Sequence, residues 1–272
     1  MATLTSRNNP KIKQIRQLLG YRKERHSSGL FVVEGIRHVG EALEAHAQVE
    51  YICYAPELLS SEFAHQLIDE QSQHGIPCYP VARDTFSSLA GKDNPQGILA
   101  VVRQSHVSLQ DISASNFPFG VALVAPQDPG NIGAILRTID AVGASGLLLL
   151  DDPSNNQYCA DPYHPSSVRA SMGAIFWYPL VSATFPEFSH WAKENAYTVY
   201  GTSAHAAQDY RLVKSYTQPL ILLLGSEREG LTPAQCSECN LMLSIPMQGR
   251  ATSLNLAIAS GVMLYTIFDK LS

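Results

Sequence analysis

The sequence contains few cysteines, no long hydrophobic run and little charge, and each shortage excludes a class of protein. Its five cysteines are odd in number and scattered over 272 residues, which favours reduced thiols over a disulfide framework. The longest apolar runs, such as residues 147–150 and 220–224, fall far short of the ~18 residues that a membrane span needs. No apolar stretch follows the charges at the amino terminus, so a secretory signal is not expected. The sequence therefore predicts a cytoplasmic protein with no membrane partner.

Two of the cysteines, Cys236 and Cys239, form a C-x-x-C pair, a spacing that zinc sites and redox centres share. A zinc site would need a second close pair of ligands, and none follows in the neighbouring sequence. We interpret the two cysteines as packing residues, with redox or metal chemistry as the open alternative. No metal is predicted.

Charged residues make up only 16% of the chain and the net charge is −5, but the charge is unevenly spread. Residues 1–26 hold seven basic residues against one acidic residue, a net charge of +6 that leaves −11 for the rest. Asn9 and Pro10 predict a helix start, and the basic residues Lys11, Lys13 and Arg16 fall mainly off its apolar stripe of Ile12, Ile15 and Leu19. Such a helix face is either simply solvated, a phosphate-binding surface or part of a transit peptide.

The hydrophobic periodicity predicts two α/β domains. In the first hundred residues, strands are expected at 30–33, 49–54 and 98–102, with helices at 36–45 and 62–73. Residues 105–118 are polar and weakly periodic, which is typical of a linker. Beyond residue 119, near-continuous apolar runs predict parallel strands covered on both faces, at 120–125, 147–150, 197–201, 220–225 and 241–245. Ligands of such sheets bind at the carboxyl ends of the strands.

Three of the loops that follow these strands carry unusual residues. After the first strand, Asn131 is placed to cap a helix, and Arg137 falls away from the middle of that helix's apolar face. After the run at 220–224, Gly225 would let the backbone approach a ligand, and Glu227 could accept from a ribose hydroxyl or an amine. The third loop runs from a Pro-Met-x-Gly turn to Ser253-Leu254-Asn255, polar residues for which local structure offers no routine reason.

Taken together, the three loops resemble the motifs of the SPOUT superfamily of methyltransferases, in its TrmH (SpoU) branch of RNA ribose 2′-O-methyltransferases. The resemblance covers residues 119–272, and the first hundred residues are similar to a substrate-binding domain with the fold of ribosomal protein L30e. The matching segments are Asn131 with Arg137, Gly225-Ser-Glu227 to Gly230, Ile245-Pro-Met247 to Ser253-Leu-Asn255, Asp161-Pro-Tyr163, Arg169-Ala-Ser-Met-Gly173, Asn9-Pro-Lys11, Phe31-Val-Val-Glu-Gly35 and Asn94-Pro-Gln-Gly97.

The resemblance implies a fold class, a domain division and a cofactor. It predicts an α/β fold in which an L30e-like RNA-binding domain (1–104) and a linker (105–118) precede a SPOUT domain (119–272) with a parallel sheet and a trefoil knot. The knot would hold S-adenosylmethionine. By position in the motifs, backbone at Gly225, Ile245 and Leu254 would contact this cofactor, with Leu224 and Met247 beside its adenine.

The resemblance also implies roles for the polar residues. Arg137 would be essential, either as the group that takes the proton of the ribose 2′-hydroxyl or as one that orients the hydroxyl and a phosphate; a guanidinium group is rarely a base. Asn131, Glu227, Ser253 and Asn255 would orient the reactants. The apolar helix expected at 256–268 needs a second surface to bury it, so a homodimer is predicted.

The substrate expected from these features is RNA, most specifically ribosomal RNA of the large subunit. Relatives that act on transfer RNA commonly carry a basic extension after the knot, whereas the sequence ends at Ser272 without one. A transfer RNA ribose methyltransferase is the first alternative, and a non-catalytic protein of RNA binding or ribosome assembly is the second. A nucleotide-dependent dehydrogenase is disfavoured because no G-x-G-x-x-G follows the first strand of the second domain.

Overall fold

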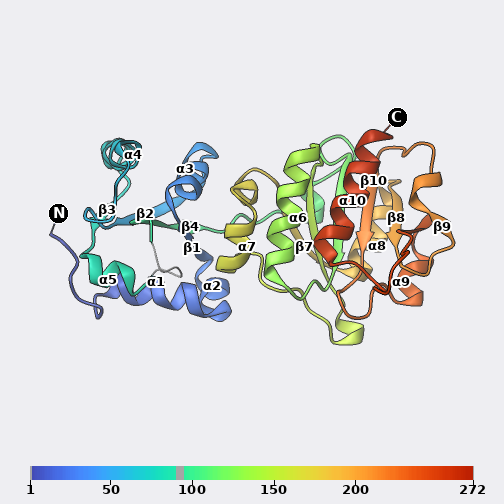
Figure 1. The fold of residues 1–272 in the computed structure, drawn as a ribbon, viewed down its shortest axis with the longest axis horizontal. Helices are drawn as coiled ribbons and strands as arrows, with labels where there is room; N and C mark the ends of the chain where they lie inside the picture. The colour runs from blue at the N-terminus through green and yellow to red at the C-terminus, as the bar shows by residue number, and fades with distance from the viewer. Residues whose placement is uncertain (1, 90–94, 272) are drawn as a thin grey trace. The chain divides into compact units, whose positions relative to one another are not determined.

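The computed structural model describes residues 2–89 and 95–271 and divides the chain into two compact units. Unit 1 comprises residues 1–104 together with 163–177, and unit 2 comprises residues 105–162 and 178–272 (Figure 1). Residues 163–177, which the resemblance assigns to the methyltransferase domain, therefore pack with the first hundred residues. Because these units reflect packing alone, the division into domains at 1–104, 105–118 and 119–272 stays a prediction.

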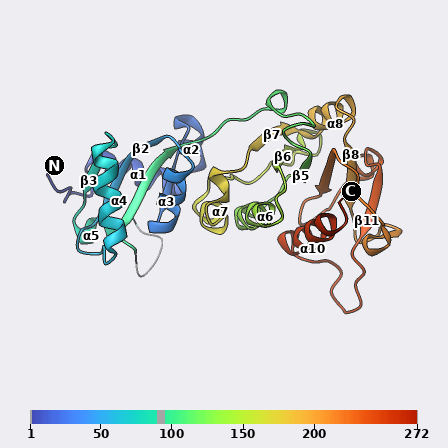
Figure 2. The ribbon, with the colours of Figure 1, turned by 90° about the horizontal axis from the view of Figure 1, so that it is seen from above.

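Unit 1 is a four-stranded sheet with helices on both faces. The strand order is β1-β4-β2-β3, in which β4 runs antiparallel to both of its neighbours and β2 runs parallel to β3. Helices α1, α2 and α5 lie on one side of the sheet, and α3 and α4 lie on the other (Figures 1 and 2). The elements are α1 (Pro10–Gly20), α2 (Arg22–Ser28), β1 (Leu30–Glu34), α3 (Ile36–Glu44), β2 (Val49–Tyr54), α4 (Glu62–Gln73), β3 (Cys78–Pro80), α5 (Arg83–Ser87), β4 (Ile98–Arg103) and α7 (Pro165–Ala170).

The helix expected at the amino terminus is confirmed, with a cap and a buried stripe. The Asn9 side chain accepts a hydrogen bond from the Lys11 amide at 2.9 Å, and Pro10 occupies the first turn. Ile12 and Ile15 are fully buried against the sheet. Since this stripe forms part of the unit's core, α1 is held by hydrophobic burial and not by its charges.

Two of the seven basic residues in this segment are not surface cations. Arg25 is 2% exposed, and its Nη1 donates to the Leu18 carbonyl at 2.6 Å, close to the end of α1. Lys11 is half-buried, with Nζ 4.3 Å from the ring centre of Tyr51 and 4.4 Å from that of Tyr79. The expectation that Lys11 belongs to an exposed basic face is corrected by this cation–π arrangement.

Residues 163–177 pack on β1 through aromatic side chains. The ring centre of Phe31 lies 4.7 Å from that of Tyr163 and 6.1 Å from that of Phe176. The Trp177 indole donates to Glu41 Oε2 at 3.1 Å. Buried aromatic contacts of this kind explain why the segment clusters with unit 1, although the chain reaches it from unit 2.

Unit 2 is a seven-stranded sheet in which all neighbouring strands run parallel, in the order β7-β6-β5-β10-β8-β11-β9. The five strands expected here are confirmed to within two residues, and β7 and β9 are additional. The elements are β5 (Phe119–Val124), α6 (Pro129–Val142), β6 (Gly146–Asp151), β7 (Leu180–Thr184), α8 (Phe185–Glu194), β8 (Thr198–Thr202), β9 (Gln208–Asp209), β10 (Leu220–Leu224), α9 (Pro233–Ser237), β11 (Leu241–Ser244) and α10 (Leu256–Asp269).

Helices cover both faces of this sheet, as the continuous apolar strands require. On one face, α8 packs Phe188 and Trp191 onto alternate strand residues such as Leu148 and Ile221. On the other face, α6 and α10 lie side by side (Figure 2). The stretch at residues 105–118 also packs in the α8-side core, where Phe117 is fully buried, so its polar sequence conceals buried anchors.

Helix α10 buries one face and leaves apolar side chains on another. Leu264 and Ile267 are fully buried. In contrast, Ile258 is 57% exposed, and Tyr265 and Phe268 are each 51% exposed. The described residues include no helix long and apolar enough to cross a membrane. The exposed face of α10 is thus an apolar surface that this chain alone does not cover.

Candidate functional site

The three motif loops are joined to one another at the carboxyl edge of the unit 2 sheet. They follow β5, β10 and β11, which are parallel strands of one sheet. Asn131 Nδ2 donates to Glu227 Oε1 at 2.9 Å, and Asn255 Nδ2 donates to Asn131 Oδ1 at 3.0 Å. Two side-chain hydrogen bonds therefore bring together one residue from each motif, although Asn131 lies 96 positions before Glu227 and 124 before Asn255.

Glu227 is the acceptor at the centre of this network. Besides Asn131, the backbone amides of Gln127 and Asp128 donate to its carboxylate, at 2.9 and 3.2 Å. Partial burial by itself would raise the pKa of Glu227, but the hydrogen bonds from Asn131 and from backbone amides outweigh it and lower the pKa overall. In this structure the carboxylate joins two loops, and its acceptance of a hydrogen bond from a substrate ribose or amine stays a prediction.

The sequence predicts that Asn131 caps α6, and this prediction is wrong because the helix starts earlier. Pro129 occupies the first turn, and Asp128 is the N-cap, with Oδ1 accepting from the Gly130 amide at 2.7 Å. Asn131 consequently lies inside the first turn and is 7% exposed. Its side chain is free of capping and bonds the other two motifs.

Gly225 is required by its own loop. A Cβ atom at Gly225 would lie 2.0 Å from the carbonyl carbon of Gly230 and 2.3 Å from the Leu231 nitrogen. The loop folds back tightly here, with a bridge between Ser226 and Gly230, and Gly230 itself has a φ of 68°. The close backbone of residues 230–231 is by itself a reason for glycine here, and the contact of Gly225 with a ligand stays a prediction.

The third motif has a structural role that the sequence analysis missed. Asn255 is the N-cap of α10, and its Oδ1 accepts from the amides of Ala257 and Ile258 at 2.9 and 3.3 Å. The same side chain reaches Asn131 through Nδ2. Ser253 and Leu254 lie just before the helix and, like Asn255, are exposed. Asn255 therefore fixes the loop, and its two neighbours remain accessible to a ligand.

Arg137 is exposed on α6, as expected, two turns beyond the motif network. Within residues 2–89 and 95–271 no hydrogen bond or ion pair engages its guanidinium group. A cation that the protein itself does not neutralise is suited to bind an anionic or hydroxyl-bearing ligand. The role of Arg137 in catalysis stays a prediction.

The residues predicted to hold the cofactor offer an apolar and main-chain environment at the same edge. Leu224 and Gly225 are buried at the end of β10, Ile245 and Met247 are half-buried after β11, and Leu254 is 37% exposed. These apolar side chains and their main chain lie beside the bonded side chains of Glu227, Asn131 and Asn255. Such a donor set suits a ligand with a planar apolar ring, and the assignment of these five residues stays a prediction.

Sequence analysis missed two residues that organise the site. Gln127 Nε2 donates to the carbonyls of Ala125 and Tyr158, at 2.7 and 3.0 Å, and thereby fixes the first loop. Asp128 caps α6. An Asp before Pro after a buried strand is a recognisable helix start, so Asp128 could have been found; the partners of Gln127 depend on tertiary contacts.

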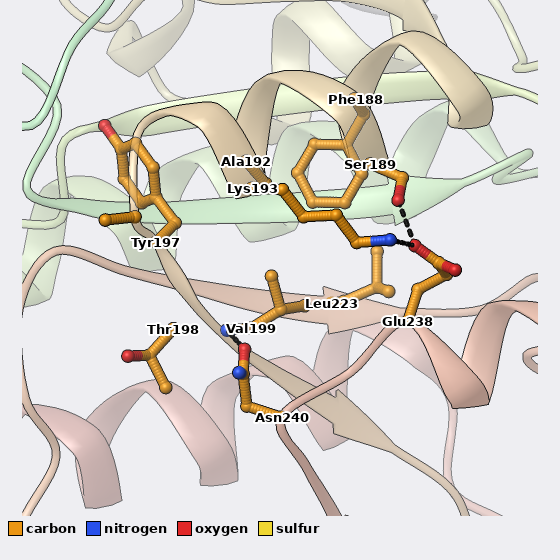
Figure 3. Close-up of a pocket in the computed structure, with 11 residues that line it drawn as sticks. Phe188, Ser189, Ala192, Lys193, Tyr197, Thr198, Val199, Leu223, Glu238 and Asn240 are labelled. Carbon is orange, nitrogen blue, oxygen red and sulfur yellow. Dashed lines mark hydrogen bonds and ion pairs between the residues drawn. The ribbon is translucent and has the colours of Figure 1, made fainter.

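A pocket of about 340 Å³ lies elsewhere in unit 2, between α8 and β8 (Figure 3). Thr198, at the start of β8, and Asn240, just before β11, line it, so it opens toward the amino ends of strands. Lys193 Nζ lies 2.5 Å from Glu238 Oε2 at its rim. The motif loops follow the opposite, carboxyl ends of the strands, so this pocket is separate from the candidate site.

The C-x-x-C cysteines are half-buried thiols. Burial raises the pKa of Cys239 to about 12 and also raises that of Cys236. Cys239 Sγ donates to the Gln235 carbonyl at 3.4 Å. Thiols held protonated in this way are poor nucleophiles and poor metal ligands. In the described part of the chain, no group of His, Cys, Asp and Glu side chains is arranged to hold a metal ion.

Comparison with known families agrees with this geometry. A model described as the SpoU rRNA Methylase family matches residues 118–265, more than half of the chain. The chain belongs to the SpoU rRNA methylase family. A second model, the MRM3-like substrate binding domain, matches residues 9–100. The SpoU match contains all three motif loops, and the substrate-binding match contains β1, β2, β3 and the start of β4.

Characterised SpoU relatives align over almost the whole chain. A 23S rRNA (uridine(2479)-2′-O)-methyltransferase of Streptomyces viridochromogenes is 35% identical, covering 96% of this chain and 90% of the relative. A 23S rRNA (guanosine(2553)-2′-O)-methyltransferase, RlmP, of Bacillus subtilis strain 168 is 30% identical, covering 97% and 98% respectively. The alignment of both units at once shows that the two-part organisation is common to these proteins.

Solved structures of SpoU proteins have the same fold. An S-adenosylmethionine-bound rRNA methyltransferase from Sinorhizobium meliloti superimposes with a TM-score of 0.86 at 33% identity, covering 98% of this chain and 97% of that one. The methyltransferase AviRb from Streptomyces viridochromogenes, with the same cofactor, gives 0.85 at 32% identity, covering 96% and 98%. These likenesses confirm the expected fold class, an α/β SPOUT domain with a parallel sheet after a substrate-binding domain.

Proposed function

We propose that this protein transfers a methyl group from S-adenosylmethionine to a ribose 2′-hydroxyl of ribosomal RNA of the large subunit, in the cytoplasm. The observation that carries the proposal is the bonded network of Glu227, Asn131 and Asn255, which unites the three motifs of a family whose characterised relatives methylate 23S rRNA. Two relatives bind S-adenosylmethionine in structures that superimpose closely on this one.

The residues present fit this cofactor. S-adenosylmethionine supplies a methyl group on a positively charged sulfur. Leu224 and Met247 would lie beside its adenine, and the backbone at Gly225, Ile245 and Leu254 would contact the cofactor. Glu227 would act at a distance, because its carboxylate holds the first loop against the second. These hydrogen bonds would hold the loops in one shape before any ligand binds.

Arg137 acts on the RNA. A ribose 2′-hydroxyl is a poor nucleophile, so it must be aligned with the methyl donor and must lose its proton. The exposed guanidinium of Arg137 can bind a phosphate oxygen and donate to the 2′-oxygen, which favours the charge that develops there. Because guanidinium groups remain protonated in proteins, water is the acceptor of the proton in this scheme. Ser253, which is exposed two residues before Asn255, would contact the same ribose.

The protein acts as a homodimer in this proposal. Ile258, Tyr265 and Phe268 are about half exposed on α10, and they recur at helical spacing. A second copy of the same helix face would bury them, which is the commonest solution for an apolar surface on a symmetric oligomer.

The decisive experiment for the proposed function is methyl transfer to defined RNA. The purified protein is incubated with isotopically labelled S-adenosylmethionine and either unmodified large-subunit ribosomal RNA or unmodified transfer RNA, and ribose methylation is mapped by its resistance to alkaline cleavage. Labelling of one ribose in ribosomal RNA is expected. Labelling of transfer RNA alone would reassign the substrate, and absence of S-adenosylmethionine binding by calorimetry would favour a non-catalytic RNA-binding protein.

A further inference from the structure

The first hundred residues hold opposite charges on the two sides of one sheet. Between residues 27 and 104 there are ten acidic residues and four basic ones, so the excess positive charge of this region lies entirely in residues 1–26. Helices α1 and α2 lie on one side of the unit 1 sheet (Figure 1). Helices α3 and α4, on the other side, carry five acidic residues and one arginine. A polyanion can therefore approach this unit favourably only from the α1–α2 side.

The exposed cations on that side gather around the corner between the two helices. Lys13 and Arg16 are exposed and lie within about 60° of each other around α1, with Lys13 roughly opposite the buried stripe and Arg16 on its flank. Arg22 and Lys23 are exposed in the first turn of α2. Lys11 and Arg25 turn inward, whereas Lys13, Arg16, Arg22 and Lys23 have exposed side chains on this side of the sheet.

A single aromatic residue stands at the apex of this corner. Tyr21 ends α1 and precedes α2, and its side chain is 64% exposed. Its backbone is held on both sides, since its amide donates to the Gln17 carbonyl at 2.8 Å and its carbonyl accepts from the Arg25 amide at 3.3 Å. The ring makes no aromatic contact in the part of the chain that the structure describes. A rigidly mounted, exposed ring among cations is an arrangement that nucleobases stack on.

We propose that the α1–α2 corner, formed by Lys13, Arg16, Tyr21, Arg22 and Lys23, binds an unpaired stretch of the RNA substrate. The Tyr21 ring stacks on a base, and the four cations contact the flanking phosphates. Unpaired RNA is the partner that fits, because a base must leave its helical stack to lie on a protruding ring, whereas a duplex would engage only the cations. The inference rests on the proposed function for the identity of the substrate as RNA.

The experiment compares RNA binding by full-length variants at several salt concentrations. The probes are a fluorescent oligouridine of about 12 nucleotides and a duplex of equal length. Tyr21→Ala is expected to weaken oligouridine binding about tenfold and duplex binding less than twofold, and Tyr21→Phe is expected to bind normally. The double variant Lys13→Gln with Arg16→Gln should lower the slope of log K against log salt by about 1.4, since each single-strand phosphate contact contributes about 0.7.

Matched controls lie on the same unit away from the corner. Phe63 on α4 is 58% exposed, so Phe63→Ala removes a ring of similar exposure from the acidic side. Arg37→Gln with Arg83→Gln removes the same charge as the corner double variant, from exposed positions on α3 and α5. All of these side chains are exposed, so the midpoint of thermal unfolding should be unchanged. If Tyr21→Ala lowers the midpoint, Tyr21→Leu replaces it. If the corner double variant lowers it, the single substitutions Lys13→Gln and Arg16→Gln replace it.

Two results would overturn the proposal: Tyr21→Ala binding oligouridine within twofold of wild type, or the control variants losing as much affinity as the corner variants. Equal loss on duplex and oligouridine would also overturn it, because the ring would then not be stacking on a base. Methyl transfer to ribosomal RNA by the wild type is measured in parallel. Its absence would refute the proposed function, whereas its presence with unaffected corner variants would refute only the α1–α2 corner.

Discussion

At the scale of single residues, the motif side chains divide by what they contact. Asn131, Glu227 and Asn255 are bonded to one another and to backbone, whereas Arg137 and Ser253 are exposed. A side chain occupied by its own protein can position a loop, and one that is exposed can touch a substrate. Substitutions in the two groups should therefore fail in different ways, the first group through loop geometry and the second through chemistry on RNA.

Arg137→Ala is expected to reduce the turnover of ribosomal RNA methylation at least ~100-fold while leaving unfolding and S-adenosylmethionine binding nearly unchanged. The physical reason is that the side chain is exposed and that no hydrogen bond or ion pair holds it among residues 2–89 and 95–271. Single-turnover methylation and calorimetry provide the measurements. Lys214→Ala, which removes an exposed cation elsewhere in unit 2, is the control. Turnover within a few-fold of wild type would remove Arg137 from the mechanism.

Glu227→Gln is expected to destabilise the protein at neutral pH and to lose this effect in acid. The pKa of Glu227 is lowered in the folded state, so the carboxylate contributes stability above its unfolded pKa of about 4.5 and loses it as the pH falls through the folded value. The difference in thermal midpoint between wild type and variant should therefore shrink from about pH 6 to about pH 4. A constant difference over that range would show that the charge of Glu227 is not what stabilises the loops.

At the scale of secondary-structure elements, two helices depend on contacts that charge or periodicity alone would misassign. Helix α1 has a basic surface, but it is fixed by Ile12 and Ile15 in the core and by the buried Arg25. Removing residues 1–26 would thus expose one face of the unit 1 sheet as well as remove cations. Point substitutions at exposed residues are the sounder test of charge. Helix α10 also depends on a contact distant in sequence, because its N-cap, Asn255, is hydrogen-bonded to Asn131.

Asn255→Ala is expected to cost about 1 kcal/mol of unfolding free energy through loss of the helix cap, with a further loss from the bond to Asn131. Asn255→Asp separates the two effects, because aspartate keeps the capping oxygen but cannot donate to Asn131. Urea unfolding measures the stability, and S-adenosylmethionine titration measures the loop. Equal stability of the alanine and aspartate variants would contradict a capping role.

At the scale of the whole molecule, the exposed apolar face of α10 is the feature that one chain leaves incomplete. Its buried face packs on α6 and β10, and its other face presents Ile258, Tyr265 and Phe268. The motif loop that contains Asn255 leads directly into this helix. Association of two chains through α10 would therefore also steady the candidate site.

Tyr265→Asp with Phe268→Asp is expected to convert a dimer of twice 29.7 kDa into a monomer and to reduce methyl transfer. Charges placed on this face would have to be desolvated in a dimer and stay hydrated in a monomer. Light scattering after size-exclusion chromatography gives the mass. The control is Leu212→Asp, which places a charge at an apolar side chain of unit 2 that is 71% exposed and lies outside α10. A wild-type protein that elutes as a monomer at working concentration would refute the dimer.

The sequence by itself determined the larger part of the fold. Alternating apolar runs and helical stripes identified three strands and three helices of unit 1 and five strands of unit 2, because these patterns depend on residues near in the chain. It missed β7 and α8, although Thr184 and Glu187 form a capping box at the start of α8. The sequence also predicted a linker at residues 105–118, because the few apolar residues that are buried there, such as Phe117, show no periodicity.

For the candidate site, the sequence determined which loops matter, and the tertiary structure decided what each residue does there. Asn131 looked like a helix cap and Glu227 like a ligand contact, yet they are hydrogen-bonded to each other across 96 positions. Likewise, the sequence indicates that Lys11 and Arg25 are surface charges, but Lys11 lies over the Tyr51 ring and Arg25 donates to the Leu18 carbonyl. Capping, pairing and burial depend on which atoms are within about 3 Å in space, and residue order constrains that only within an element.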